Sequence, residues 1–214
     1  TSLTSVTIPK SVTSIGSYTF SGCTSLTDIT IPDSVTYIGY DAFSGCTSLE
    51  SIVIPDSVTY ISYNAFQNCT SLESIVIPNS VTYINEYVFY NCTSLTSVTI
   101  PDSVTYIDYY AFSGTKIKEI DIPSSVSGIS SSAFSNSSIQ RINFGGSEEE
   151  WKRIDSYGSL SENILVTFKS KSKTEFKHQD DTGMTIEVGR VTFDSSYAGK
   201  YVTVPVKVFN NTGF

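Results

Sequence analysis

The chain of 214 residues has little positive charge and almost no histidine. It carries 13 lysine and arginine residues against 21 aspartate and glutamate residues, which gives a formal net charge of -8, and His178 is its only histidine. Nucleic acids and anionic membrane surfaces bind proteins through basic patches, so we expect neither as a partner. The chain also lacks an apolar run of about 18 residues, so we expect no membrane span in it.

Motifs that carry chemistry are missing as well. The sequence contains no G-x-S-x-G elbow, no catalytic pair of carboxylates and no glycine-rich phosphate loop. The repeats contain no histidine, and we expect their concave side to hold no convergent polar group that could be tuned for catalysis. We therefore expect no enzyme: no catalytic residue, no metal site and no cofactor.

What the sequence does have is a repeat. The dipeptide Ile-Pro returns every 23 residues and then once after 22, at Ile8, Ile31, Ile54, Ile77, Ile100 and Ile122. A fixed period of this length predicts a solenoid, in which each unit contacts only its neighbours and the product is an extended surface. The first unit lacks its opening part, so we expect further repeats or a cap before residue 1.

One repeat shows how the coil is built. In the unit at residues 49–70, Leu49, Ile52 and Ile54 form the L-x-x-I-x-I pattern of a leucine-rich-repeat strand with alternate side chains buried. Proline ends the strand, and we expect Asp56 and Ser57 to form a turn by bonding nearby backbone N–H groups. A phenylalanine per unit should anchor a short helical or irregular segment behind it. Those phenylalanines are Phe20, Phe43, Phe66, Phe89, Phe112 and Phe134.

Four cysteines share the period, at Cys23, Cys46, Cys69 and Cys92. Equivalent positions on stacked coils have parallel Cβ vectors, whereas a disulfide needs them to converge. No C-x-x-C motif is present, and the one histidine lies outside the repeats. We therefore expect buried free thiols that pack as small apolar groups.

The outward positions of the strands are the first candidates for contact with a partner. They form a concave face of small, mostly neutral residues, with charge toward its C-terminal end. The candidates are Asp28, Thr30, Ser51, Ser74, Ser97, Thr99, Glu119 and Asp121.

Tyrosines form the second set of candidates. One row recurs at Tyr37, Tyr60, Tyr83 and Tyr106, and a partial second row at Tyr40, Tyr63 and Tyr109. One interpretation is a ladder of self-stacking rings that shields the edges of the coils. The other is an amphipathic aromatic strip that contacts protein or sugar. Asp33, Asp56, Asn79 and Asp102 also align, and turn capping explains them more simply than calcium does.

Beyond the array at 1–144 the pattern changes. Ser147 and Glu150 form a capping box that predicts a short helix to about Ile154, and we expect Trp151 to close the end of the core within a cap at 145–168. Residues 169–183 are polar and charged and resemble a linker. Residues 184–214 alternate like the opening strands of an incomplete β-rich domain, whose unpaired edges would allow self-association.

The unit I-P-x-S-V-T-x-I-x-x-x-A-F-x-x-C-T-S-L, at residues 31–49 and 54–72, resembles the BspA-like, or Treponema-type, leucine-rich repeats. The resemblance covers about residues 1–144 and implies a bacterial surface or secreted protein that takes part in adhesion. Residues 144–151 look like the closing segment of such arrays in gut Clostridia-like bacteria. Residues 186–191 and 202–208 are similar to the first strands of cohesin modules, which implies a link to cellulosomes.

The sequence thus predicts a mostly β fold with short helical or irregular segments. It is a leucine-rich-repeat solenoid of about six coils of 22–23 residues with a C-terminal cap, followed by a truncated β-sandwich-like segment. We expect a non-catalytic, extracellular or cell-surface scaffold that binds a protein or another surface macromolecule. The alternative is a carbohydrate-binding module that uses the tyrosine rows on a polysaccharide.

Overall fold

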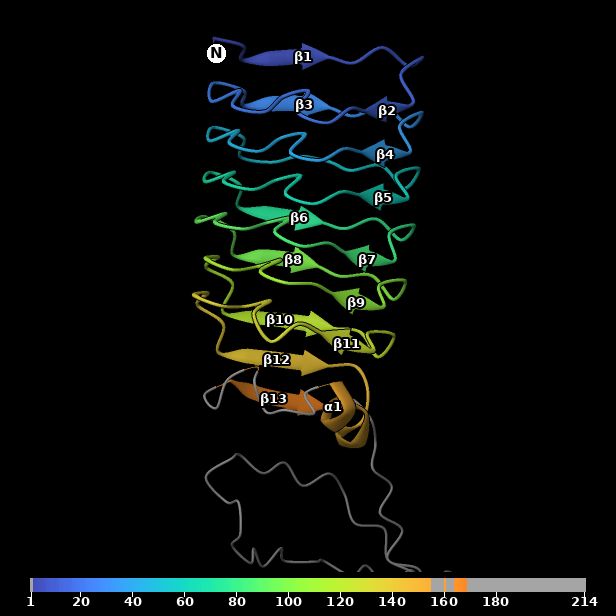
Figure 1. The fold of residues 1–214 in the computed structure, drawn as a ribbon, viewed down its shortest axis with the longest axis vertical. Coiled ribbons are helices and arrows are strands. Elements are labelled where there is room, and N and C mark those ends of the chain that lie inside the picture. Colours follow the sequence, from blue (N-terminus) through green and yellow to red (C-terminus); the bar gives the residue numbers. More distant parts are fainter. Residues whose placement is uncertain (1, 155–159, 161–163, 169–214) are drawn as a thin grey trace, which may run out of the picture. The chain divides into compact units, whose positions relative to one another are not determined.

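A computed structural model of the chain describes residues 2–154, 160 and 164–168. The chain divides into two compact units, Thr1–Lys169 and Ser170–Phe214. The first unit is a stack of coils, one per repeat (Figure 1), and is the mostly β solenoid that the period predicted. The linker expected at 169–183, the domain expected at 184–214 and the self-association expected through its strands lie outside the described residues.

One side of the stack is built from short parallel strands. They are β1 (Ser5–Thr7), β3 (Asp28–Thr30), β6 (Ser74–Val76), β8 (Ser97–Thr99), β10 (Glu119–Ile122), β12 (Arg141–Phe144) and β13 (Leu165–Phe168). They pair as β1-β3, β6-β8 and β10-β12-β13, with a single bridge from Thr30 to Val53 in the coil that follows β3. The register joins equivalent residues of successive repeats, as in Ser74 with Ser97. We call the outward surface of these strands the strand face.

A second side carries strands of two residues each. They are β2 (Ser14–Ile15), β4 (Tyr37–Ile38), β5 (Tyr60–Ile61), β7 (Tyr83–Ile84), β9 (Tyr106–Ile107) and β11 (Gly128–Ile129). They form two parallel sheets, β2-β4-β5 and β7-β9-β11, so β5 and β7 are not paired with each other.

Asn85 occupies the break between β5 and β7. Its side-chain Nδ2 donates to the Ile61 carbonyl at 2.6 Å, and its Oδ1 lies 3.4 Å from the Tyr60 hydroxyl, which donates to it. One coil further on, the backbone N–H of Asp108 makes the corresponding bond to the Ile84 carbonyl at 2.9 Å. A buried carbonyl needs a donor, so the Asn85 amide takes the place of the missing backbone bond.

The core follows the predicted alternation. Leu72, Ile75 and Ile77 are buried, whereas Ser74 and Val76 between them face solvent. The six phenylalanines form one continuous stack, with ring centroids of neighbours 5.2–5.7 Å apart. Burial of these rings and aliphatic ladders is the main stabilising contribution, because removal of apolar surface from water dominates folding.

The segment behind the core is irregular rather than helical. Two positions in each of the first five coils have left-handed backbone, as at Asn64 and Asn68, both with φ of 57°, and the next coil has one, at Asn136. A helix cannot pass through such positions, and asparagine and glycine adopt them at least cost. Backbone bonds between coils replace the helical ones, as from Phe43 N to Ala65 O at 2.8 Å and from Phe66 N to Val88 O at 3.0 Å.

The cysteines are free and buried, as predicted. They also do more than fill space, because each thiol of the last three donates to a phenylalanine carbonyl of the preceding coil, Cys46 to Phe20 at 3.1 Å among them. Burial raises the pKa of the Cys46 and Cys92 thiols to about 12, so both stay protonated at neutral pH.

The turn after each proline differs from the prediction. The Ser57 hydroxyl donates to the Val35 carbonyl of the preceding coil at 2.6 Å, whereas we expected it to bond a nearby N–H. The same bond recurs at Ser34, Ser80, Ser103 and Ser125. Because the coils stack, the carbonyl of one coil lies next to the serine hydroxyl of the following coil, and their hydrogen bond links the two coils. Asp56 remains exposed.

The helix expected after the array is present, and β13 follows it in the chain. Helix α1 (Glu148–Ile154) begins with the predicted capping box, in which Ser147 N donates to Glu150 Oε2 at 2.7 Å and Glu150 N donates to Ser147 Oγ at 3.3 Å. The Ser147 N–H and the Ser147 hydroxyl both donate to the Glu150 carboxylate and so lower its pKa. Trp151 is buried against Phe144, with ring centroids 5.3 Å apart, and so covers the end of the core.

Candidate binding surfaces

The strand face is exposed at every position that the sequence nominated. Asp28, Thr30, Ser51, Ser74, Ser97, Thr99, Glu119 and Asp121 all face solvent. Between them lie two exposed valines, Val53 at 80% and Val76 at 62% of full exposure. The face is therefore a row of small polar side chains with an apolar patch at its middle.

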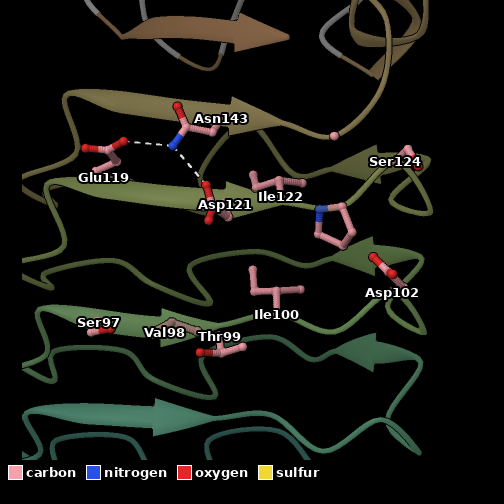
Figure 2. A pocket seen from close by; sticks show the side chains of 12 residues that line it. Ser97, Val98, Thr99, Ile100, Asp102, Glu119, Asp121, Ile122, Ser124 and Asn143 are labelled. Carbon is pink, nitrogen blue, oxygen red and sulfur yellow. Dashed lines mark hydrogen bonds between the residues drawn. The ribbon is translucent and has the colours of Figure 1, made fainter. Parts of the chain in front are cut away.

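Toward its C-terminal end the strand face is hollowed. A depression of about 600 Å³ lies over β8, β10 and β12 (Figure 2), and four of the nominated residues line it: Ser97, Thr99, Glu119 and Asp121. β8 and β10 are not hydrogen-bonded to each other, and the break coincides with the first 22-residue repeat. Val98, expected in the core ladder, is half-buried and also lines the depression.

A polar network orders the carboxylates of the depression. Asn143 Nδ2 donates to Glu119 Oε1 and to Asp121 Oδ1, each at 2.8 Å, as Figure 2 shows. Thr167 Oγ1 donates in turn to Asn143 Oδ1 at 2.7 Å, and Arg141 Nε lies 4.0 Å from Glu119 Oε1. Thr167 was not nominated from the sequence, although its register opposite Asn143 follows once β13 is placed beside β12.

The first tyrosine row is a stacked ladder with a gap. Tyr37 stacks on Tyr60 at 5.8 Å and Tyr83 stacks on Tyr106 at 5.1 Å, and the ladder is interrupted between β5 and β7. Tyr83 and Tyr106 are half-buried, and the Tyr83 hydroxyl donates to Asp108 Oδ2 at 3.1 Å. Burial, followed by this bond to a carboxylate, raises the pKa of Tyr83, so its phenol is neutral.

The second row is more open. Tyr40, Tyr63 and Tyr109 are all exposed, and Tyr40 meets Tyr18 edge to face with centroids 5.3 Å apart. We call the surface formed by both rows the tyrosine edge.

Sequence reasoning missed a third set of tyrosines on this edge. Tyr18, Tyr87 and Tyr110 share one place in the repeat, and Tyr87 stacks on Tyr110 at 5.1 Å and meets Tyr90 edge to face. The signal was the 23-residue register itself, in which Asp41 and Asn64 hold the same place in the intervening coils.

Among the residues that the structure describes, no three histidine, cysteine, aspartate or glutamate side chains come together in a way that would hold a metal ion. No helix in the described part of the chain is long and apolar enough to cross a bilayer.

Parallel coils with a leucine-rich strand on one side define the class of this protein as a leucine-rich-repeat solenoid. Residues 1–114 and 82–174 match the BspA type Leucine rich repeat region, in six copies. The chain belongs to this BspA-type leucine-rich repeat family.

Three solved structures are similar. A leucine rich cell surface protein from Faecalibacterium prausnitzii A2-165 is 44% identical, with a TM-score of 0.62, and the match covers 66% of this chain and 39% of that one. A leucine-rich repeat protein from Eubacterium ventriosum ATCC 27560 is 33% identical, with a TM-score of 0.50, over 64% of this chain and 44% of that one. The T. pallidum Leucine Rich Repeat protein is 29% identical, with a TM-score of 0.49, and the match covers 66% of this chain and 72% of that one. No curated protein matches the chain.

Proposed function

We propose that this chain is a non-catalytic binding scaffold of a bacterial cell surface, and that its strand face contacts a protein partner. The observation that carries the proposal is the pair Val53 and Val76, which are 80% and 62% exposed at the middle of the strand face, among small polar residues. Burial of exposed apolar surface drives protein association. Small neighbours such as Ser51 and Ser74 let a partner approach the sheet closely.

The surface location rests on the Faecalibacterium relative, which is described as a cell surface protein and is 44% identical. This chain spans 39% of that relative, so the partners of the whole protein are part of the proposal. The cellulosome link stays a prediction, since the strands that motivated it lie outside the described residues.

The test measures adhesion of fluorescent beads coated with the chain to a monolayer of cultured epithelial cells. Val53→Lys/Val76→Lys places two charges on the apolar patch and should abolish most adhesion. Thr59→Lys/Thr82→Lys is the matched control, because it places the same charges on the same two coils at exposed positions of the second side.

Treatment of the cells identifies the class of partner. Protease should remove adhesion, and periodate, which cleaves sugar diols, should leave it. Adhesion that survives protease but not periodate, equal loss in the two double variants, or no adhesion by the unmodified chain contradicts the proposal.

A carbohydrate-binding module remains the second candidate, because the tyrosine edge exposes aromatic rings. Sugars bind proteins by stacking on the faces of aromatic rings. In the first row Tyr37 stacks on Tyr60 and Tyr83 stacks on Tyr106, so each of these rings already has one face covered. Retention of the chain on insoluble polysaccharide that is lost in Tyr60→Ala/Tyr83→Ala supports this candidate, and unchanged retention removes it.

A further inference from the structure

One coil of the second tyrosine row carries an acid in place of tyrosine. In the 23-residue register Tyr63 is followed by Glu86 and then by Tyr109. Backbone bonds hold these coils side by side, from Asn64 N to Glu86 O at 3.2 Å and from Tyr87 N to Tyr109 O at 3.0 Å. Glu86 therefore lies one coil away from a tyrosine on either side.

The three side chains have capacity for a ligand. Tyr63 and Tyr109 are 44% and 52% exposed, and neither stacks on another ring within the described part of the chain, unlike Tyr87, which stacks on Tyr110. The Glu86 carboxylate makes no hydrogen bond or ion pair with any residue that the structure describes. In the repeat register, a carboxylate thus holds the position between two exposed tyrosines that stack on no other described ring.

The surrounding charge favours a cation. The sequence contains no lysine, arginine or histidine between Lys10 and Lys116, a stretch that holds nine acidic residues. Asp108 adds a second carboxylate beside this site, and its oxygens already accept from the Tyr83 hydroxyl at 3.1 Å and from Tyr109 N at 2.8 Å. Since no described basic side chain forms an ion pair with Glu86, an incoming cation meets a negative charge that the described residues do not neutralise.

We propose that Tyr63, Glu86 and Tyr109 form a docking site for an arginine side chain of a protein partner. A guanidinium is planar, accepts bidentate pairing with a carboxylate and stacks on aromatic faces, and this arrangement offers both contacts. A lysine ammonium is a compact point charge and gains less from the rings. A neutral sugar can also stack on these rings, but the negative charge of Glu86 does not strengthen its binding as it strengthens that of a cation.

This site lies on the tyrosine edge and does not require that the strand face bind. The test is fluorescence anisotropy of a labelled hexa-arginine peptide with the full chain at low salt. Glu86→Gln should weaken binding roughly 2- to 5-fold, the loss of one exposed ion pair, because both tyrosine rings stay in place. Glu86→Tyr introduces the residue that both neighbouring coils carry, at Tyr63 and Tyr109, so it should fold and also weaken binding by removing the charge.

The matched control is Glu73→Gln, which removes the same charge from an exposed residue of the preceding coil. It should change binding less than about twofold, because only the long-range field is altered. A hexa-lysine peptide should bind several-fold more weakly than hexa-arginine.

Three results overturn the proposal. Equal losses in Glu86→Gln and Glu73→Gln mean that only net charge attracts the peptide. Equal affinity for the two peptides means that the rings take no part. Binding of cellohexaose that depends on Glu86, with peptide binding unchanged, makes the site one for sugar. The adhesion assay uses other variants, so the two proposals can fail separately.

Discussion

Replacing Phe66 with alanine should lower the free energy of unfolding by about 3–5 kcal/mol. The side chain is fully buried and stacks on Phe43 at 5.2 Å and on Phe89 at 5.7 Å. Alanine leaves a cavity bounded by a ring on either side. Those rings are held by coils that are themselves hydrogen-bonded in register, so the cavity can collapse only in part.

A second variant separates ring stacking from burial. Phe66→Leu keeps most of the apolar volume but removes two stacked pairs, each worth about 0.5–1.5 kcal/mol, so it should cost about 1–3 kcal/mol. Phe134 lies at the end of the row and stacks only on Phe112 among the described rings, at 5.6 Å. Phe134→Leu should therefore cost about half as much.

The assay is urea unfolding of the full chain followed by far-UV circular dichroism, with midpoints compared at constant slope. A loss below about 1 kcal/mol for Phe66→Ala refutes the placement of the row in the core. Equal losses for the two leucine variants refute the contribution of stacking.

Other predictions concern the strand, the thiols and the coil junction. Leu72→Ala should cost about 2–5 kcal/mol in the same assay and Ser74→Ala little, and comparable losses would mean that the strand faces the other way. Cys46 and Cys92 should not react with Ellman's reagent at pH 8 until urea is added, because burial raises the pKa of both thiols to about 12; rapid reaction of the native chain contradicts this. Asn85→Ala should cost about 1–3 kcal/mol by leaving a buried carbonyl without its donor, and a neutral effect would mean that the coils close without the amide.

The period alone predicted which residues are buried, because a stack of equivalent coils gives every member of a column the same environment. Leu72 and Phe66 follow from this directly. The exposed strand positions follow from the alternation of side chains along a strand. The prediction that the cysteines are free followed from the same symmetry, because equivalent positions on stacked coils have parallel Cβ vectors and a disulfide needs them to converge.

The sequence did not predict what happens between coils. The Ser57 hydroxyl finds its acceptor one coil away, and no local pattern distinguishes that bond from a turn within its own coil. Asn85 interrupts the second side because its amide reaches the Ile61 carbonyl, a contact that depends on three-dimensional stacking. The depression on the strand face arises likewise where β8 and β10 are neighbours without pairing.

The most direct test of the proposed binding face is site-specific blocking. Ser74→Cys on the strand face and Thr82→Cys on the second side introduce exposed thiols, while the native cysteines are buried. Each variant is coupled to a polyethylene glycol maleimide and assayed by bead adhesion to epithelial cells. We predict that the polymer at residue 74 abolishes adhesion and that the polymer at residue 82 leaves it intact. If the polymer at residue 82 abolishes adhesion and the polymer at residue 74 does not, the result contradicts the account and places the binding surface at the tyrosine edge.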